Sequence, residues 1–334
     1  MKLLRYAGIL CALCGAAGFV TTAQAAREAD PNAKDLVLKG DAKCTGCHDE
    51  ADEPLPTMLE LHPGVLSIGK TRHGTQADKR TPSCTNCHGD SLDHMNYKGK
   101  DKPPKPDRVF MKGPALSNAK LRSEACTSCH KGGSHMFWPV STHAINEVGC
   151  NDCHKIHSAR DKVRDKRTQT EVCYSCHKQQ RAEMSKPSRH PVHEGKMSCS
   201  DCHSPHGSPG QKQLTKGTVN ETCYSCHMEK RGPFINNHQP VSEDCSICHQ
   251  PHGTTVANLL KSRPPFLCQE CHESTQHVSS SSPGGLPVAT AAGFGPAGRG
   301  QWASVGRGCV NCHTNIHGSN NPINNGTSGD RLTR

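Results

Sequence analysis

The sequence has little of the material that usually builds a protein interior. Leu, Ile, Val and Phe together supply 49 of its 334 residues, and aromatic residues make up only 4%. Its mean hydropathy is −0.69. A chain this polar cannot bury enough apolar side chain to offset the conformational entropy that it loses on folding. Either the chain is disordered, or something other than its own side chains fills its interior.

The sequence also lacks an apolar run long enough to cross a bilayer. One short apolar stretch, over residues 6–20, follows two basic residues and leads to the sequence Ala-Gln-Ala at 23–25. This arrangement is typical of a secretory signal peptide and favours it over a membrane anchor. We predict a signal peptide over residues 1–25 and an exported mature chain over residues 26–334, with no transmembrane segment of its own.

Cysteine and histidine, in contrast, are abundant, with 22 and 23 residues. Two of the cysteines fall within the predicted signal peptide, and the other 20 all lie in ten Cys-x-x-Cys-His motifs. Numbered 1 to 10 in chain order, the motifs are formed by Cys44, Cys47 and His48; Cys84, Cys87 and His88; Cys126, Cys129 and His130; Cys150, Cys153 and His154; Cys173, Cys176 and His177; Cys199, Cys202 and His203; Cys223, Cys226 and His227; Cys245, Cys248 and His249; Cys268, Cys271 and His272; and Cys309, Cys312 and His313.

This motif is the attachment signature of c-type haem, in which two thioethers hold the porphyrin and the adjacent His supplies an axial nitrogen to iron. Zinc sites and disulfides also use closely spaced cysteines, but neither requires a His directly after every second Cys. A redox dithiol does not fit either, because a thioredoxin-like protein needs one such motif. The sequence therefore predicts ten covalently bound haem c groups, each with its motif His as the proximal ligand.

The motifs pair into five units, which open at Cys44, Cys126, Cys173, Cys223 and Cys268. Each unit has a first motif, an intervening His, a second motif and a trailing His a few residues later, as in the strings CHKIH, CHSPH and CHQPH. Such a period indicates an internal repeat. A trailing His is tethered too close to its own motif to reach the far face of that haem. We therefore expect it to ligate a neighbouring haem and to brace the array.

The intervening and trailing histidines equal the open iron positions in number, which predicts bis-histidine, low-potential haems. The predicted distal ligands are His73, His94, His143, His157, His190, His206, His238, His252, His277 and His317. A lone His is usually a solvated surface residue, but ten that repeat with the motifs are not. We interpret His62, His135 and His193 as ordinary residues, with His62 competing with His73 for one haem. Methionine, the other axial ligand considered, does not recur with the units.

The count of ligands also bears on function. A haem enzyme needs an iron position open to substrate, and this count leaves none vacant. The Cys-x-x-Cys-Lys variant typical of multihaem nitrite reductases is absent from the sequence. We therefore predict electron transfer with no catalytic residue, and keep a nitrite- or hydroxylamine-type enzyme as an alternative. The net charge of +10 does not indicate nucleic-acid binding, because two propionates on each haem would offset it.

The expected fold is that of a multihaem cytochrome c, with a few short α-helices, mostly loop and almost no β-structure. Because few residues serve each haem, the haems must touch in one continuous, elongated decahaem domain built from five two-haem repeats. A Lys/Pro-rich connector over 98–108 separates the first two units. A flexible insertion is predicted over 279–308 and a mobile tail over 319–334. A division into pentahaem halves near 185–198 stays open.

Several segments carry a resemblance to a known family. The ten motifs, the CHxxH strings and the segments TRHG at 71–74, TCYSCHMEKRGP at 222–233 and CVNCHTNIHGS at 309–319 resemble the MtrA/MtoA/DmsE family of periplasmic decahaem cytochromes. The likeness covers nearly the whole mature chain and is greatest from Cys126 onward. It implies a molecular wire in the periplasm, associated with the outer membrane and held inside a β-barrel porin of that membrane.

The resemblance also implies partners at both ends of such a wire. A tetrahaem quinol-linked cytochrome or a small periplasmic cytochrome would exchange electrons at the periplasmic end. Iron or an outer-surface multihaem cytochrome would meet the outer end. Relative potentials set the direction, so both Fe(II) oxidation and the reduction of Fe(III) or another metal stay open. The alternative is a free periplasmic shuttle that serves a terminal reductase without a porin.

Overall fold

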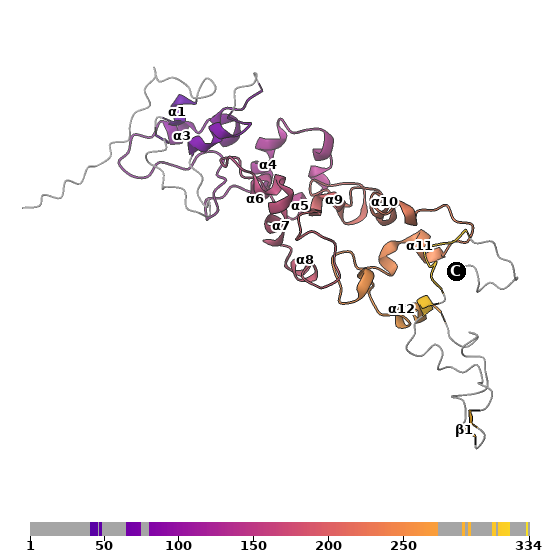
Figure 1. Cartoon of the computed structure of the whole chain (residues 1–334). Coiled ribbons are helices and arrows are strands. Elements are labelled where there is room, and N and C mark those ends of the chain that lie inside the picture. Colours follow the sequence, from indigo (N-terminus) through magenta and orange to yellow (C-terminus); the bar gives the residue numbers. More distant parts are fainter. Residues whose placement is uncertain are drawn as a thin grey trace, which may run out of the picture.

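The computed structural model describes an elongated protein in which the elements follow one another from α1 at one end to α12 near the other (Figure 1). The described residues are 41–45, 47–48, 65–74, 80–272, 289–290, 293–294, 309–311, 313–320 and 332. Several predicted features lie outside them: the signal peptide over 1–25, Cys312, His62, His277, most of the insertion over 279–308 and most of the tail over 319–334. No helix among the described residues is long and apolar enough to cross a membrane.

The helices are short, and α4 and α7 each have nine residues. The α-helices are α1 (Ala42–Thr45), α2 (Cys84–His88), α3 (Leu92–Met95), α4 (Ala119–Thr127), α5 (Thr142–Ile145), α6 (Cys150–Cys153), α7 (Lys166–Tyr174), α8 (Lys178–Glu183), α9 (Cys199–Cys202), α10 (Val219–Tyr224), α11 (Gln239–Glu243) and α12 (Phe266–Gln269). A six-residue 3₁₀ helix covers Val65–Lys70, and single 3₁₀ turns cover Gly133–His135, Trp138–Val140, Lys162–Arg164, Gln211–Gln213, Met228–Lys230, Cys245–Ile247, Ala257–Leu259 and Cys309–Asn311.

The described residues include two β-strands of two residues each. β1 (Ala289–Thr290) and β2 (Gly293–Phe294) pair antiparallel, with Ala289 opposite Phe294 and Thr290 opposite Gly293. Both fall within the predicted insertion. Short helices, extensive loop and almost no β-structure among the described residues confirm the fold class predicted from the sequence.

Capping residues explain where the longer helices begin. The side chains of Asn118, Asp165 and Thr218 accept hydrogen bonds from backbone amides in the first turns of α4, α7 and α10. Such caps satisfy amides that have no partner inside the helix. Each of these helices then ends within the first motif of a unit, at Thr127, Tyr174 or Tyr224. The caps therefore fix where the first motifs of units 2, 3 and 4 lie.

Side chains form only a small core in the described part of the chain. Tyr174, Met184 and Val192 make a buried cluster against which Met197 packs. No described side chain is less than 2% exposed, whereas Ile235 is 77% exposed. Packing of apolar side chains against one another therefore buries little surface in this part of the chain, as the composition indicated.

Polar side-chain contacts instead join the two motifs of units 2 and 3. In unit 2, Arg122 is 4% exposed and reaches from α4 to Asp152 of α6 at 3.1 Å, and it also binds Asn151. In unit 3, Lys166 of α7 contacts Asp201 of α9 at 3.0 Å, but its side chain is 60% exposed. The same connection between motif helices is thus buried in one unit and solvated in the next.

This difference predicts unequal stability effects. Because replacing one partner of a buried pair leaves an uncompensated charge, we expect Arg122→Met to lower the free energy of unfolding by about 3 kcal/mol. The matched variant Lys166→Met should cost at most about 1 kcal/mol, since exposed pairs contribute little. Urea unfolding of the holoprotein followed by circular dichroism measures both values, and equal losses would contradict the proposed role of Arg122.

Candidate haem-binding sites

Each described Cys-x-x-Cys-His motif folds into the same turn. In nine motifs the amide of the motif His donates to the carbonyl of the first Cys at 2.9–3.1 Å, and motif 2 is helical throughout as α2. In a helical turn, residues three and four positions apart share one face. The spacing therefore directs both thiols and the imidazole toward the same side, where one porphyrin can meet all three.

The two motifs of each predicted unit meet at their first cysteines. The thiols of these residues lie within hydrogen-bonding contact in the pairs Cys44–Cys84, Cys126–Cys150, Cys173–Cys199, Cys223–Cys245 and Cys268–Cys309. The contact lowers the pKa of Cys44, Cys199 and Cys245 to about 7.

Neighbouring units, in turn, approach through second cysteines. These residues lie close enough to interact electrostatically in the pairs Cys87–Cys129, Cys153–Cys176, Cys202–Cys226 and Cys248–Cys271. The two kinds of approach alternate, so consecutive motifs are neighbours in space along the described chain.

The most regular feature of the structure is a set of histidine pairs. Nine motif histidines each face one of the predicted distal histidines, and their ring centroids are 6.0–6.4 Å apart. The pairs are His48–His94, His88–His157, His130–His73, His154–His206, His177–His143, His203–His252, His227–His190, His249–His317 and His272–His238. The tenth motif His, His313, is described, but the remaining predicted ligand, His277, is not.

This spacing fits a shared iron atom. Two metal–imidazole bonds of about 2 Å each, in line through one iron, place the ring centroids roughly 6 Å apart. Rings in direct contact would be closer, and unrelated rings would not repeat one distance nine times.

Several imidazoles are held in the tautomer that a metal needs. The Nδ1 atoms of His143 and His190 lie 2.9 and 2.8 Å from the carbonyl oxygens of Pro205 and Pro251. Both prolines stand directly before a trailing His in the next unit. A ring that donates its Nδ1–H to a carbonyl keeps the lone pair of Nε2 free for iron.

Motif histidines are oriented in the same way. The Nδ1 atoms of His203 and His249 lie 3.0 and 2.9 Å from the carbonyls of Lys212 and Asn258, nine residues further on in each case. Lys212 and Asn258 adopt left-handed φ angles of 50° and 60°. This tight turn brings the carbonyl back to the ring, which is a reason for backbone strain at these positions.

Two rings instead donate to carboxylates at hydrogen-bonding distance, whereas Nδ1 of a third, His227 of motif 7, lies 3.6 Å from the exposed carboxylate of Glu229. Nδ1 of His154 lies 2.7 Å from Asp161, and Nδ1 of His252 lies 3.1 Å from Glu183. Burial acts to raise the pKa of both acids, but hydrogen bonds from the imidazoles and from neighbouring groups outweigh it and hold each pKa below its usual range. Both carboxylates are therefore ionised at neutral pH.

Burial also sets the charge of the distal imidazoles. It lowers the pKa of His206 to about 4, with further contributions from His135 and His154 nearby. Burial likewise lowers the pKa of His73 and His317. These rings are thus neutral near pH 7, as ligation requires.

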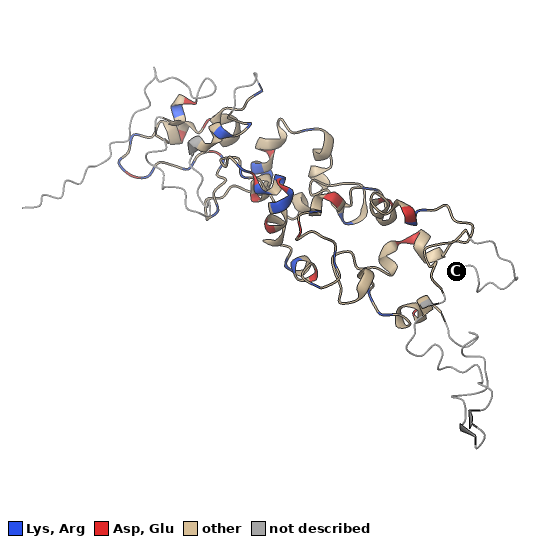
Figure 2. Ribbon diagram, viewed as in Figure 1, with Lys and Arg blue, Asp and Glu red and all other residues tan. Residues whose placement is uncertain are grey.

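The basic side chains offer partners for haem propionates. The Nε atoms of Arg108 and Arg189 are buried without a hydrogen-bond partner in the described residues, although buried polar atoms are usually paired. Lys and Arg recur along the described length together with Asp and Glu (Figure 2).

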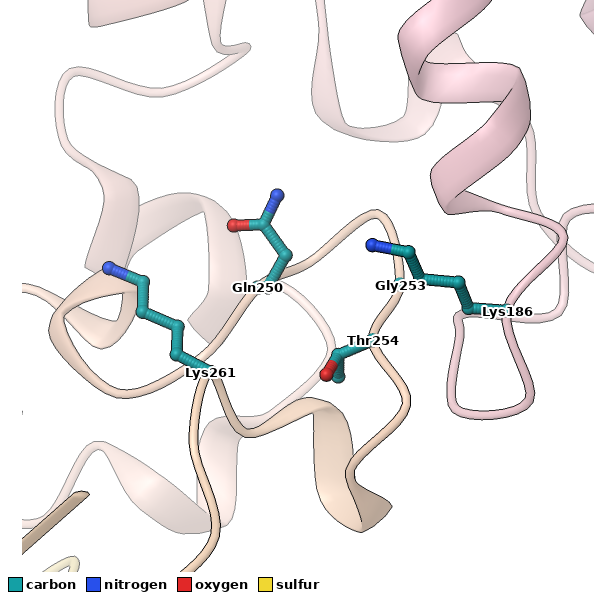
Figure 3. Close-up of a pocket in the computed structure, with 5 residues that line it drawn as sticks. All are labelled: Lys186, Gln250, Gly253, Thr254 and Lys261. Atoms are coloured by element: carbon teal, nitrogen blue, oxygen red, sulfur yellow. The ribbon is translucent and has the colours of Figure 1, made fainter. Parts of the chain in front are cut away.

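One polar hollow also fits an anionic group. It has a volume of about 250 Å³ and is lined by Lys186, Gln250, Gly253, Thr254 and Lys261. In Figure 3 the two lysines lie on opposite sides of the lining residues, and Gln250 directly follows the His of motif 8. The thiols, the imidazoles and these basic side chains therefore all suit haem c, although Arg189 also binds Glu194 at 2.8 Å.

Sequence reasoning missed one histidine in this array. His135, interpreted as an ordinary residue, lies with its ring 4.3 Å from that of His206 and 5.6 Å from that of His130. At 4.3 Å the two tilted rings, with 37° between their planes, are in direct contact and cannot bind one iron from opposite faces. No counterpart of His135 recurs in other units, so the repeat gave no signal for it. His193 lies elsewhere, with Nε2 3.5 Å from the Tyr174 hydroxyl.

Comparison with known proteins places these features in a family. Residues 190–232 and 238–277 match the doubled CXXCH motif family, and residues 84–167 match the family of NrfB-like c-type cytochrome proteins. The chain is 40% identical over 284 residues to the multiheme cytochrome MtrA of Shewanella baltica strain OS185, a match that spans 85% of this chain and 80% of that protein. Identity at this level and over this length shows that the chain belongs to the MtrA family of multihaem c-type cytochromes, which transfer electrons through covalently bound haem.

Proposed function

We propose that the chain holds ten haem c groups, each between a motif His and a distal His, and passes electrons along them in motif order. The set of nine imidazole pairs at nearly constant spacing carries this proposal. Haem iron, when bound, supplies reversible one-electron chemistry. The residues of the chain set its ligands, its neighbours and its surroundings.

The pairs obey one rule, which the sequence did not reveal. The intervening His of a unit faces the first motif His of the following unit, in the pairs His73–His130, His143–His177, His190–His227 and His238–His272. The trailing His of a unit faces the second motif His of the preceding unit, in the pairs His157–His88, His206–His154, His252–His203 and His317–His249. Each junction between units is thus crossed by two ligands in opposite directions.

The ends of the array close differently. In unit 1 the trailing His94 has no preceding unit to serve, and it faces His48 of its own unit. By the same logic the intervening His277 of unit 5 has no following unit. We assign it to His313, which completes ten pairs from the twenty histidines.

The cysteine contacts support an order for the proposed haems. First cysteines join the two motifs within a unit, and second cysteines approach between units. Each motif therefore neighbours the motifs before and after it, and electrons would follow the chain order from motif 1 to motif 10. Among the described pairs no iron keeps a position for substrate, which suits transfer rather than catalysis.

The location and partners of the proposed wire follow from its sequence, its shape and its family. The predicted signal peptide, the elongated array and membership of the MtrA family support a periplasmic wire inside an outer-membrane β-barrel porin. A tetrahaem quinol-linked or small periplasmic cytochrome would serve one end, and iron or an outer-surface multihaem cytochrome the other. Both oxidation of Fe(II) and reduction of Fe(III) are compatible with this arrangement.

Removing one trailing His tests the ligation across units. His252 is a better residue to substitute than His206, because the ring of His135 lies 4.3 Å from that of His206 and could replace it as a ligand. We expect His252→Ala to convert one haem from low to high spin in the electron paramagnetic resonance and visible spectra. The matched variant His193→Ala, which removes a His beside Tyr174, should leave the spectra unchanged.

A second change locates the altered haem. On our assignment His252 serves motif 6, although it follows motif 8 in the sequence. Adding Cys199→Ser and Cys202→Ser to His252→Ala should abolish the high-spin signal together with the motif 6 haem. Adding Cys245→Ser and Cys248→Ser should keep that signal, and the reverse pattern would show that His252 ligates within its own unit.

Purification of the native protein tests the haem count and the porin. We expect the pyridine haemochrome assay to give ten haems per chain, one for each motif, and an outer-membrane β-barrel to co-purify in a fixed ratio. A count of eight or fewer would refute the motif assignment. Ten haems without any β-barrel would favour the free periplasmic shuttle.

A further inference from the structure

In units 1 to 4 the His of the second motif is oriented through Nδ1 by an oxygen from a following loop, and unit 2 uses a different kind of oxygen. In units 1, 3 and 4 the rings of His88, His203 and His249 lie 3.2, 3.0 and 2.9 Å, through Nδ1, from backbone carbonyl oxygens. In unit 2 the corresponding ring, that of His154, faces the carboxylate of Asp161 at 2.7 Å. A full negative charge thus replaces a neutral dipole at one place in the repeat.

The side chain of Asp161 binds the imidazole of His154, because the nearby cations bind other groups. Its side chain is 18% exposed, and the backbone amide of Lys155 donates to its second oxygen at 3.5 Å. The adjacent Arg160 instead binds Asp165, and the Lys155 ammonium donates to the carbonyl of Asn151 at 2.8 Å. Neither cation therefore draws Asp161 away from His154.

Glu183 makes a second contact of this kind on the other ligand type. Its side chain is 11% exposed and lies 3.1 Å from Nδ1 of the trailing His252. Gln179 and Gln250 donate to the same carboxylate at 3.0 and 3.3 Å. By contrast, the intervening His143 and His190 face the carbonyls of Pro205 and Pro251. Glu229 lies 3.6 Å from Nδ1 of His227, beyond hydrogen-bonding distance, and its side chain is 59% exposed, so solvent screens its charge.

On the basis of the proposed function, we infer that Asp161 and Glu183 are tuning residues that lower the reduction potentials of the haems at motifs 4 and 6 below those of their neighbours. A carboxylate that accepts the Nδ1–H bond makes the imidazole a more basic ligand. It also places negative charge next to the iron site. Both effects favour the oxidised over the reduced state, since the oxidised centre carries one more positive charge.

The placement of the two carboxylates shapes the path of the electrons. Motifs 4 and 6 flank motif 5, whose ligand His143 is oriented by a carbonyl at 2.9 Å. The centre of the wire therefore contains two low-potential positions separated by one of higher potential. The residues of the chain therefore make the reduction potentials of successive haems unequal along the wire.

Removing the charge while keeping the hydrogen bond tests this inference. Asp161→Asn retains an acceptor oxygen, so the fold and ligation should persist, with ten haems and low-spin spectra. In an optical redox titration of the holoprotein we expect a shift toward higher potential confined to one tenth of the absorbance change, one haem among ten. A tenfold change in that haem's reduction equilibrium corresponds to about 59 mV.

The matched control is Asp165→Asn, which removes the same charge four residues away. Asp165 binds Arg160 and caps α7, and we expect its variant to titrate as the wild type does. An unchanged titration of Asp161→Asn with ten low-spin haems would overturn the inference while leaving the proposed function intact, and so would an equal shift in the control. Missing or high-spin haems in the wild type would instead refute the proposed function.

Glu183→Gln repeats the test independently. It should raise the reduction potential of the motif 6 haem, with a fold-change in its reduction equilibrium comparable to that of Asp161→Asn. If Asp161→Asn fails to retain its haems, the titration of Glu183→Gln alone tests the inference. A combination of both variants should shift two tenths of the absorbance change, because motifs 4 and 6 are separate irons. A double variant that shifts no more than either single variant would show that the two carboxylates do not act on different haems.

Discussion

Most of this structure follows from holding two imidazole rings about 6 Å apart on opposite sides of a flat group. The repeated turn of the motif directs one ring, and a residue from a neighbouring unit supplies the other. Capped helices, left-handed turns and proline carbonyls then serve to aim those rings. Ordinary side-chain packing contributes little, since the buried apolar cluster of the described chain contains only Tyr174, Met184 and Val192. The proposed haems thus take over the role of a hydrophobic core.

The sequence was sufficient for the features that repeat. The motif spacing identified the residues that fold into the repeated turn, and the scarcity of apolar residues predicted short helices and extensive loop. The recurrence of histidines identified the nine residues that the structure brings opposite motif histidines. Local chemistry is repeated in each unit, so it can be recognised from the chain alone.

The sequence could not predict which histidines meet. His157 lies opposite His88, far away along the chain, because neighbouring units interlock in space. It also could not predict what is unique to one unit. Asp161, Glu183 and His135 have no counterparts in the other units, so no pattern singled them out. Their positions depend on how loops fold back onto the array, which is a matter of tertiary structure.

The ligands that cross every junction have a consequence for how such a chain can change in length. A unit duplicated between two existing ones would supply its intervening His to the following unit and its trailing His to the preceding unit. Its own two haems would receive one distal His from each neighbouring unit. No iron would be left short and no imidazole left over. Deleting an internal unit would preserve the balance equally, whereas breaking the chain at a junction would strip a ligand from a haem on each fragment. Descendants of this architecture can therefore grow or shrink in steps of two haems, while the special pairings at the two termini stay where they are.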